Sequence, residues 1–202
     1  MSVQFQAENL TKSRGGRTVI DAVSFNLRDG GSLCVTGPNG SGKSTLLRLC
    51  AGLLRPDAGS TLFFIDGLRA ETSGGRNCAC AAPDFRWYGE LTARENIALL
   101  HSDDPAKSSR CESFCRRFGL GPFLDTRLEQ YSSGMSQRFS LAMAFGLDAP
   151  LLILDEPSSF LDAEGKDAFR EIFREESPSR VVIIAANEPD DAALCEKEVR
   201  LG

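Results

Sequence analysis

The chain of 202 residues is 42% hydrophobic and 25% charged, which predicts one folded domain that is large enough to bury a core. Its formal net charge of −5 and pI of about 5.0 argue against a nucleic-acid partner and against an anionic-membrane surface. The first residues lack the features of a signal peptide, and no apolar run approaches the roughly 20 residues of a membrane helix. We therefore expect a cytoplasmic protein without direct membrane insertion.

The seven cysteines are scattered among apolar positions, which predicts reduced thiols that serve as small hydrophobic side chains. The close pairs are Cys78 with Cys80 and Cys111 with Cys115, and neither has C-x-x-C spacing. We expect ordinary thiols rather than metal ligands or redox centres. The single histidine, His101, precedes a polar stretch, which favours a solvated helix end over a catalytic role.

The beginning of the chain has the pattern of a half-buried sheet. Apolar and polar side chains alternate over residues 3–30, around a turn-like segment at 13–17, which predicts antiparallel strands. Residues 61–67 predict another strand that closes in a turn, and residues 71–76 predict a polar Gly/Ser loop.

The pattern becomes helical between about residues 78 and 130. Apolar side chains recur at helical spacing over residues 91–100 and 111–120, which predicts two amphipathic helices joined by polar loops. We expect residues 83–138 to form an all-helical lobe inserted between strands.

Two largely apolar runs, at residues 151–157 and 181–186, then return the chain to an α/β pattern, with a helix predicted between them over residues 163–175. Continuous apolar runs are typical of strands that are buried on both faces of a parallel sheet. We expect a single domain in which residues 1–82 and 139–202 form an α/β core with an antiparallel β part.

The sequence between Gly37 and Thr45 is a glycine-rich motif, placed where an apolar run at 33–36 ends and a helical pattern at 46–50 begins. It fits G-x-x-x-x-G-K-[ST], whose backbone N–H groups close around phosphate oxygens at the positive end of the following helix. In this motif Lys43 reaches the β- and γ-phosphates, and Ser44 ligates Mg²⁺. The loop residues expected to bind a nucleoside triphosphate are Gly37, Asn39, Gly40, Ser41, Gly42, Lys43, Ser44 and Thr45.

Two adjacent carboxylates, Asp155 and Glu156, follow the buried run at residues 151–154. Ligands of doubly wound sheets bind at the carboxyl ends of strands. There Asp155 is placed to hold Mg²⁺, and Glu156 is placed to polarise the attacking water.

Residues 131–138 read Tyr-Ser-Ser-Gly-Met-Ser-Gln-Arg and open a helical pattern over residues 139–146. Hydroxyl and amide groups at a helix N-terminus suit either a simple cap or the binding of an anion. The candidate anion-binding residues are Ser132 and Gly134.

The glycine-rich loop, this helix opening and the Leu-Leu-Ile-Leu-Asp-Glu-Pro strand occur in one order, with a helical lobe between the first two. In this combination the chain resembles the ATP-binding cassette (ABC) ATPases over essentially its whole length, and most closely compact single-cassette subunits such as the haem-exporter ATPases. The resemblance implies an α/β P-loop NTPase core with a mostly parallel sheet, an N-terminal antiparallel β subdomain and an inserted α-helical lobe.

The resemblance also implies a function, namely an ATP-hydrolysing motor subunit that binds ATP and Mg²⁺. It assigns Mg²⁺ to Ser44 and Asp155, and the role of general base to Glu156. It places Ser132 and Gly134 over the γ-phosphate of a second ABC subunit, in a homo- or heterodimer arranged head to tail with Asp162 at the contact. The implied membrane partners are transmembrane permease subunits, which would hold the protein at the inner face of the membrane.

Three positions depart from the family pattern. The place of the adenine-stacking aromatic falls at Arg14, which is interpreted either as stacking on the base or as a solvated loop residue. Pro83 or Asp84 stands where the family has a glutamine. Asn187 replaces a histidine that contacts the γ-phosphate, and because its amide relays no proton we expect slow hydrolysis with nucleotide binding preserved.

Other functions remain open. A degenerate or regulatory cassette that acts as an ATP-dependent switch is favoured by the altered positions. A soluble ABC protein of translation or DNA repair is disfavoured by the acidic charge and the single cassette. Finally, Phe85, Trp87 and Tyr88 belong either to a groove that receives a permease helix or to the core of the lobe.

Overall fold

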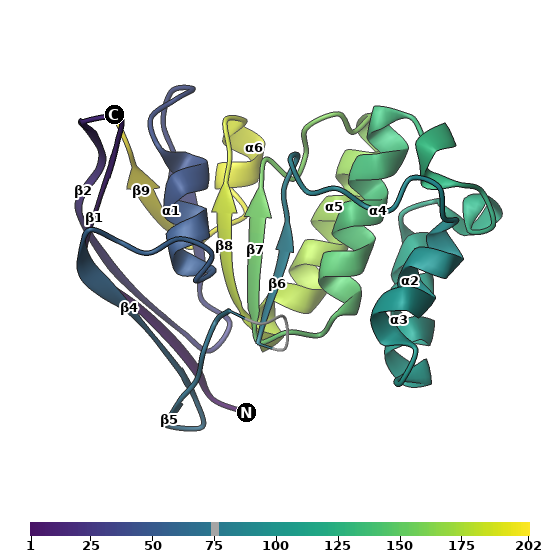
Figure 1. Ribbon diagram of the computed structural model, residues 1–202, viewed down its shortest axis with the longest axis horizontal. Helices are drawn as coiled ribbons and strands as arrows, with labels where there is room; N and C mark the ends of the chain where they lie inside the picture. The colour runs from purple at the N-terminus through teal and green to yellow at the C-terminus, as the bar shows by residue number, and fades with distance from the viewer. Residues whose placement is uncertain (74–76) are drawn as a thin grey trace.

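The computed structural model describes residues 1–73 and 77–202, so the predicted polar loop at 71–76 lies partly outside the described residues. Within the described residues the strands form a four-stranded antiparallel sheet, in the order β2-β1-β4-β5, and a five-stranded parallel sheet, in the order β6-β7-β8-β3-β9. Figure 1 shows the antiparallel sheet at one end of the molecule, the parallel sheet in the centre and helices α2 and α3 at the other end. The predicted fold class is confirmed.

The antiparallel sheet is built from long strands of alternating burial. It comprises β1 (Val3–Arg14), β2 (Arg17–Arg28), β4 (Ala58–Ile65) and β5 (Leu68–Arg69). Phe5 is fully buried in β1, and its ring packs against those of Phe25 and Phe63 on the neighbouring strands. The alternation over residues 3–30 therefore predicted this part correctly, because one face of the sheet packs on the core and the other faces solvent.

The parallel sheet comprises β3 (Ser32–Thr36), β6 (Cys78–Ala81), β7 (Leu151–Asp155), β8 (Val181–Ala185) and β9 (Lys197–Arg200). Every residue of β7 and β8 is buried. Alternate side chains of β8 belong to two different hydrophobic clusters, one on each face of the sheet. This double burial explains the continuous apolar runs.

Helices cover both faces of the parallel sheet. Helix α1 (Lys43–Cys50) lies between the parallel and the antiparallel sheets, whereas α4 (Ser133–Gly146) and α5 (Ala163–Glu176) lie on the opposite face (Figure 1). A short helix, α6 (Pro189–Ala192), follows β8, and a 3₁₀ turn at Ser177–Ser179 precedes it. The helix predicted over 139–146 begins earlier, at Ser133, because Ser132 caps it by accepting a hydrogen bond from the Met135 N–H.

The helical region between β6 and α4 contains α2 (Ala93–His101) and α3 (Pro105–Arg117), followed by 3₁₀ turns at Gly121–Phe123 and Leu128–Gln130. Helix α2 begins with a capping box of Thr92 and Glu95. Helix α3 starts six residues before the predicted position because Asp104 caps it and Pro105 suits its first turn. No helix in residues 1–73 and 77–202 combines the length and the apolar character that a bilayer crossing requires.

The expected solvated position of His101 is wrong. The residue does end α2, but it is buried, with only 8% of its surface exposed. Burial also lowers the pKa of its imidazole. The polar residues that follow it in the sequence suggested solvent, whereas α3 folds back onto α2, and the Ser108 hydroxyl of α3 donates to the His101 carbonyl oxygen at 3.2 Å.

Two glycines of the antiparallel sheet provide a test of its backbone geometry. Gly59 and Gly67 have φ angles of +82° and +78°. A Cβ at Gly59 would lie 2.3 Å from the carbonyl oxygens of Glu8 and Asn9, next to a register shift between β1 and β4, whereas a Cβ at Gly67 would meet nothing.

We expect Gly67→Ala to lower the free energy of unfolding by about 1 kcal/mol, through backbone strain alone. Gly59→Ala adds a backbone collision, and we expect a further loss of roughly 2 kcal/mol. Urea titrations of the two variants measure the difference. Equal losses would contradict the close approach of the strands at Gly59.

Candidate active site

The loop between β3 and α1 is a compact cradle formed by glycines. Gly37, Gly40 and Gly42 have φ angles of +144°, +82° and +104°, a region that side chains with a Cβ rarely adopt. A Cβ at Gly42 would lie 2.7 Å from the Val19 carbonyl oxygen of β2. The spacing of glycines in the sequence therefore reflects both backbone conformation and the close approach of a neighbouring strand.

Lys43 is the first residue of α1 and folds back over this loop. Its side chain is largely buried, and its ammonium donates hydrogen bonds to the carbonyl oxygens of Gly37 at 2.8 Å and Pro38 at 3.3 Å. The Ser41 hydroxyl is buried and has no hydrogen-bond partner among the described residues. A held positive charge and an unpaired hydroxyl in one concave loop fit the oxygens of a phosphate group.

Asp155 is the last residue of β7 and is buried beside Ser44 at the start of α1. Burial raises the pKa of its carboxyl, and the Ser44 hydroxyl opposes this shift. A hydroxyl and a buried carboxylate are the ligand types that hold Mg²⁺ together with substrate phosphates. In residues 1–73 and 77–202, no three or more His, Cys, Asp or Glu side chains lie together in a way that could hold a metal ion.

Glu156 is held by contacts from several elements. Its φ angle is +49°, and its N–H donates to the Ala185 carbonyl oxygen of β8 at 2.8 Å. One carboxylate oxygen accepts from the Asn187 amide at 2.8 Å, and the other accepts from the Ser159 hydroxyl at 3.2 Å. The side chain is therefore oriented by groups that follow two neighbouring strands.

Asn187 lies at the centre of the site. Its Nδ2 group donates to the Oδ1 atom of Asn39 in the loop, at 3.2 Å, as well as to Glu156. Asn187 also lines a cavity of about 740 Å³ with Asn39 and residues of β9. The structure thus brings together the candidates from the loop after β3, from the end of β7 and from the end of β8.

Other candidates lie apart from this group. Arg14 ends β1 at an exposed hairpin tip, and within the described residues its side chain makes no hydrogen bond or ion pair, so base stacking stays a prediction. Ser132 and Gly134 lie at the N-terminus of α4, across the parallel sheet from α1 (Figure 1). No hydrogen bond in the described part of the chain joins them to the phosphate loop. Gly134 instead lies close to the segment that follows β7, because a Cβ at this position would be 2.9 Å from the Phe160 carbonyl oxygen.

Asp84 contributes to a second cavity near the phosphate loop. It forms an ion pair with Arg48 of α1, and both line a cavity of about 200 Å³ together with Ser44 and Asp155. Arg48 was not predicted from the sequence, although it follows Ser44 by four residues and therefore shares its helix face.

Gln137 was also missed. It is buried in α4, and its amide donates to the carbonyl oxygens of Pro157 at 3.0 Å and Glu156 at 3.3 Å. The sequence carries no signal for this role, because Gln137 stands between Ser136 and Arg138, and its burial follows from the packing of α4 against the segment after β7.

A family model described as "ABC transporter" matches residues 20–159 of the chain. The chain therefore belongs to the ABC transporter family, as one of its ATP-binding cassettes. The predicted resemblance to the ABC ATPases is confirmed.

Relatives match the chain almost from end to end. The cytochrome c biogenesis ATP-binding export protein CcmA of Escherichia coli strain K12 is 33% identical over 197 residues, covering 96% of this chain and 93% of the relative. CcmA of Brucella abortus strain 2308 is 34% identical over 188 residues, covering 91% and 85%.

Solved structures share the fold. An ATP-binding subunit of an ABC transporter matches with a TM-score of 0.84 and 26% identity, covering 98% of this chain and 85% of that one. A dimeric ATP-binding cassette in a post-hydrolysis state, bound to ADP and Pi, matches with a TM-score of 0.82 and 22% identity, covering 98% and 94%.

The carboxyl of Asp191 makes the stability of the fold depend on pH in a way that can be measured. Asp191 is only 2% exposed and accepts a hydrogen bond of 2.6 Å from the Ser158 hydroxyl. Burial raises the pKa of this carboxyl, and the hydrogen bond from Ser158 opposes the shift. Since the folded state binds the proton more tightly, this group stabilises the fold below its unfolded pKa, and that contribution is lost as the pH rises through the folded pKa.

We therefore expect the contribution of Asp191 to the free energy of unfolding to disappear as the pH rises. The loss begins at about pH 4, the pKa of the carboxyl in the unfolded chain, and ends at the higher pKa of the folded state. Asp191→Asn retains an oxygen for Ser158 and removes the titration. Urea unfolding of both proteins across this window should show a gain in relative stability for the variant as the pH rises. A constant difference would contradict the raised pKa.

Proposed function

We propose that this protein hydrolyses ATP to ADP and phosphate with Mg²⁺ and couples the reaction to transport through membrane-embedded permease subunits. The observation that carries the proposal is the convergence of Lys43, which follows β3, with Asp155 and Glu156 at the carboxyl end of β7, on the same edge of the parallel sheet. Family membership supports ATP hydrolysis, and the relatives named as export proteins of cytochrome c biogenesis support export as the direction of transport.

The phosphate loop binds the triphosphate in this proposal. Its N–H groups and the Lys43 ammonium contact phosphate oxygens, and the Ser41 hydroxyl gains the partner that it lacks. Ser44 and Asp155 hold Mg²⁺, which neutralises charge on the phosphates. A cation also compensates the buried charge of the Asp155 carboxylate.

Glu156 acts as the general base for the attacking water. Asn187 and Ser159 fix the two oxygens of its carboxylate, so the group is oriented before substrate binds. Asn187 takes the histidine position as a positioning residue, since its amide donates hydrogen bonds but carries no proton for relay. We therefore propose slow hydrolysis with full nucleotide binding.

A second subunit completes the site. Ser132 and Gly134 open α4 on the face of the sheet opposite α1, and Ser132 is exposed. In a head-to-tail dimer they contact the γ-phosphate held by the partner's phosphate loop, with Asp162 at the subunit contact. Phe160, which is 67% exposed, lies directly before this contact region.

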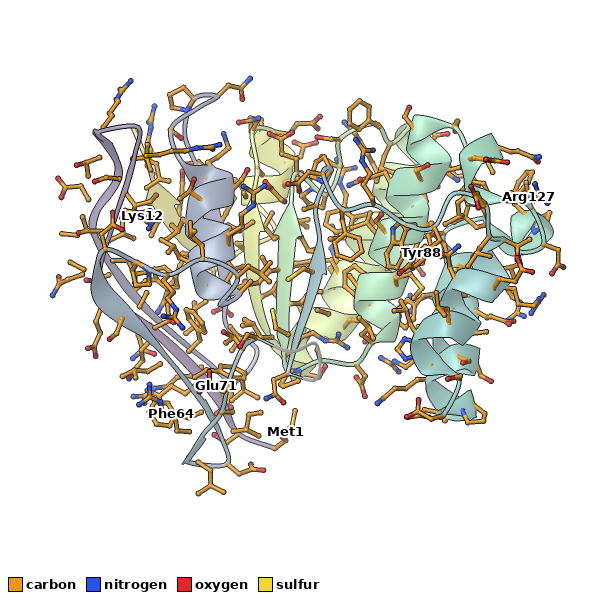
Figure 2. All side chains as sticks on the ribbon, in the orientation of Figure 1. Met1, Lys12, Phe64, Glu71, Tyr88 and Arg127 are labelled. Atoms are coloured by element: carbon orange, nitrogen blue, oxygen red, sulfur yellow. The ribbon has the colours of Figure 1, made fainter. Side chains whose placement is uncertain are left out.

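Permease subunits dock on the lobe in this proposal, which keeps the cassette at the inner face of the membrane. Trp87 belongs to the lobe core, because its indole N–H donates to Ser140 at 2.9 Å and its ring packs on Phe139. Phe85 and Tyr88 are 50% and 61% exposed and remain available for a permease helix. Figure 2 places Tyr88 on the side of the molecule away from Lys12 and the antiparallel sheet.

Replacing Asn187 with histidine tests the proposal that Asn187 makes ATP hydrolysis slow. We expect Asn187→His to raise kcat by about tenfold or more, since general acid–base groups contribute roughly 10²–10⁴-fold, while ATP affinity stays unchanged. Steady-state phosphate release measures turnover, and fluorescence titration measures affinity. Asn187→Ala is the control that removes the contacts with Glu156 and Asn39 without adding a titratable group. Equal turnover in the unsubstituted and histidine proteins would contradict the assigned role of position 187.

Replacing Glu156 with glutamine separates a motor from an ATP-dependent switch, the second candidate that Asn187 favours. We expect Glu156→Gln to form a dimer with ATP that persists during gel filtration, because binding continues while hydrolysis stops. Lys43→Ala, which weakens phosphate binding, should remain monomeric. If the unsubstituted protein forms as much stable dimer as Glu156→Gln, the switch is correct and the motor is not.

A further inference from the structure

Two thiols lie in contact on β6, the strand at one edge of the parallel sheet (Figure 1). Cys78 and Cys80 are two residues apart and therefore project from the same face of the strand. Their sulfur atoms are 3.6 Å apart. Cys78 is buried, whereas Cys80 is partly exposed. Cys80 thus has a sulfur partner within hydrogen-bond distance and is a partly exposed residue.

The exposed side of Cys80 faces the cavity of about 200 Å³ next to the phosphate loop. Ser44 and Asp155 line one part of this cavity, and the ion pair of Arg48 with Asp84 lines another. The exposed side chains of Leu53 and Phe85 also border it. A small molecule that attaches to Cys80 therefore lies beside the groups proposed to bind Mg²⁺.

The hydrogen bond between the two thiols makes Cys80 the more acidic member of the pair. Either sulfur can be the donor by geometry, and the deeper burial of Cys78 favours the proton on that sulfur. The hydrogen bond with Cys78 lowers the pKa of Cys80, and the same hydrogen bond together with burial raises the pKa of Cys78. The thiolate is the reactive form of cysteine, so Cys80 combines reactivity with access.

The remaining cysteines lack this combination. Cys50 is fully buried, and burial raises the pKa of its thiol. Burial also raises the pKa of Cys111 to about 11 and that of Cys115 to about 12. A hydrogen bond to Cys195 lowers the pKa of Cys34, but Cys34 is fully buried. Cys195 is partly exposed like Cys80, yet its hydrogen bond with Cys34 raises its pKa. It is therefore a matched internal control.

We propose that Cys80 is a modification site at which a small disulfide forms a mixed disulfide, and that the attached group fills the cavity beside Ser44 and Asp155. The Cys80 thiolate attacks one sulfur of the reagent, and a new S–S bond forms as the reagent's own S–S bond breaks. Cys80 is oxidised, and the departing half is reduced to a thiolate that takes a proton from water. A free thiol reverses the reaction by the same exchange.

This inference changes the expectation that all seven cysteines are ordinary hydrophobic thiols. The effect of the adduct on ATP rests on the proposed function, because the cavity is shared with the proposed metal ligands. The reactivity of Cys80 does not depend on it.

Dithiodipyridine is a suitable probe, because it is a small symmetrical disulfide. The full-length protein is treated with less than one equivalent and quenched in acid, and adducts on all seven cysteines are quantified by peptide mass spectrometry. We expect the first adduct on Cys80, well ahead of Cys195. First labelling at any other cysteine would overturn the proposal.

Variants of Cys78 test the hydrogen bond. Cys78→Ala removes the donor, and a tenfold loss of Cys80 thiolate should slow labelling by roughly threefold, because the remaining thiolate is intrinsically more nucleophilic. Cys78→Ser keeps an O–H donor and should keep most of the rate. An unchanged labelling rate of Cys80 in Cys78→Ala would contradict the proposal that Cys78 activates the Cys80 thiol. If this variant does not fold, the order in which the seven cysteines of the unsubstituted protein are labelled still tests the reactivity of Cys80.

ATP turnover and Mg²⁺-ATP affinity are then measured on the labelled protein. We expect at least one of them to fall in parallel with Cys80 labelling and to recover with dithiothreitol, while Cys80→Ala retains both and resists the reagent. If labelling of Cys80 alters neither, the adduct does not act on the site and this part of the inference is wrong. Absence of turnover in the unlabelled protein would instead contradict the proposed function.

Discussion

The burial of β7 and β8 on both faces is the constraint on which the active site depends. Every side chain of these strands is enclosed, so polar groups emerge only where the strands end. Because β7, β8 and β3 are neighbours in the parallel sheet, their carboxyl ends place Asp155 with Glu156, Asn187 and the phosphate loop at one edge. The arrangement of the candidate site is therefore a consequence of sheet order, and helices cover both faces of that sheet.

Local sequence patterns predicted the parts of the site that have fixed backbone requirements. The glycines at 37, 40 and 42 and the carboxylates after a buried run are such cases, because each requirement is met within a few neighbouring residues. The contacts between distant segments were not predictable in this way. Asn187 meets Asn39 across 148 positions, Arg48 meets Asp84 across 36, and His101 is covered by packing that its polar neighbours do not indicate. These contacts depend on tertiary structure, which a single sequence does not encode in a readable pattern.

The backbone at Glu156 shows how the fold stores strain at the proposed general base. A φ angle of +49° costs a non-glycine residue on the order of 1–2 kcal/mol, so surrounding contacts must enforce it. The N–H of Glu156 is held by Ala185, and the carbonyl oxygens of Glu156 and Pro157 are held by the buried Gln137. The strained backbone directs the carboxylate toward Asn187 and Ser159. Gln137 therefore links the helix that carries Ser132 and Gly134 to the proposed general base of the same chain.

The ion pair between Arg48 and Asp84 bears on how the lobe responds to nucleotide when the usual glutamine is absent. Arg48 is one helical turn after Ser44, and Asp84 lies on the segment that leads from β6 into α2, so one contact joins the phosphate-loop helix to the entrance of the lobe. Both side chains border the cavity that contains Ser44, Asp155 and Cys80. A cation at Asp155 or an adduct at Cys80 would therefore occupy the cavity that this ion pair borders. Because the side chains of Arg48 and Asp84 are 43% and 64% exposed, solvent screens this pair, and the contacts of Trp87 with Ser140 and Phe139 hold the lobe to the core independently of it.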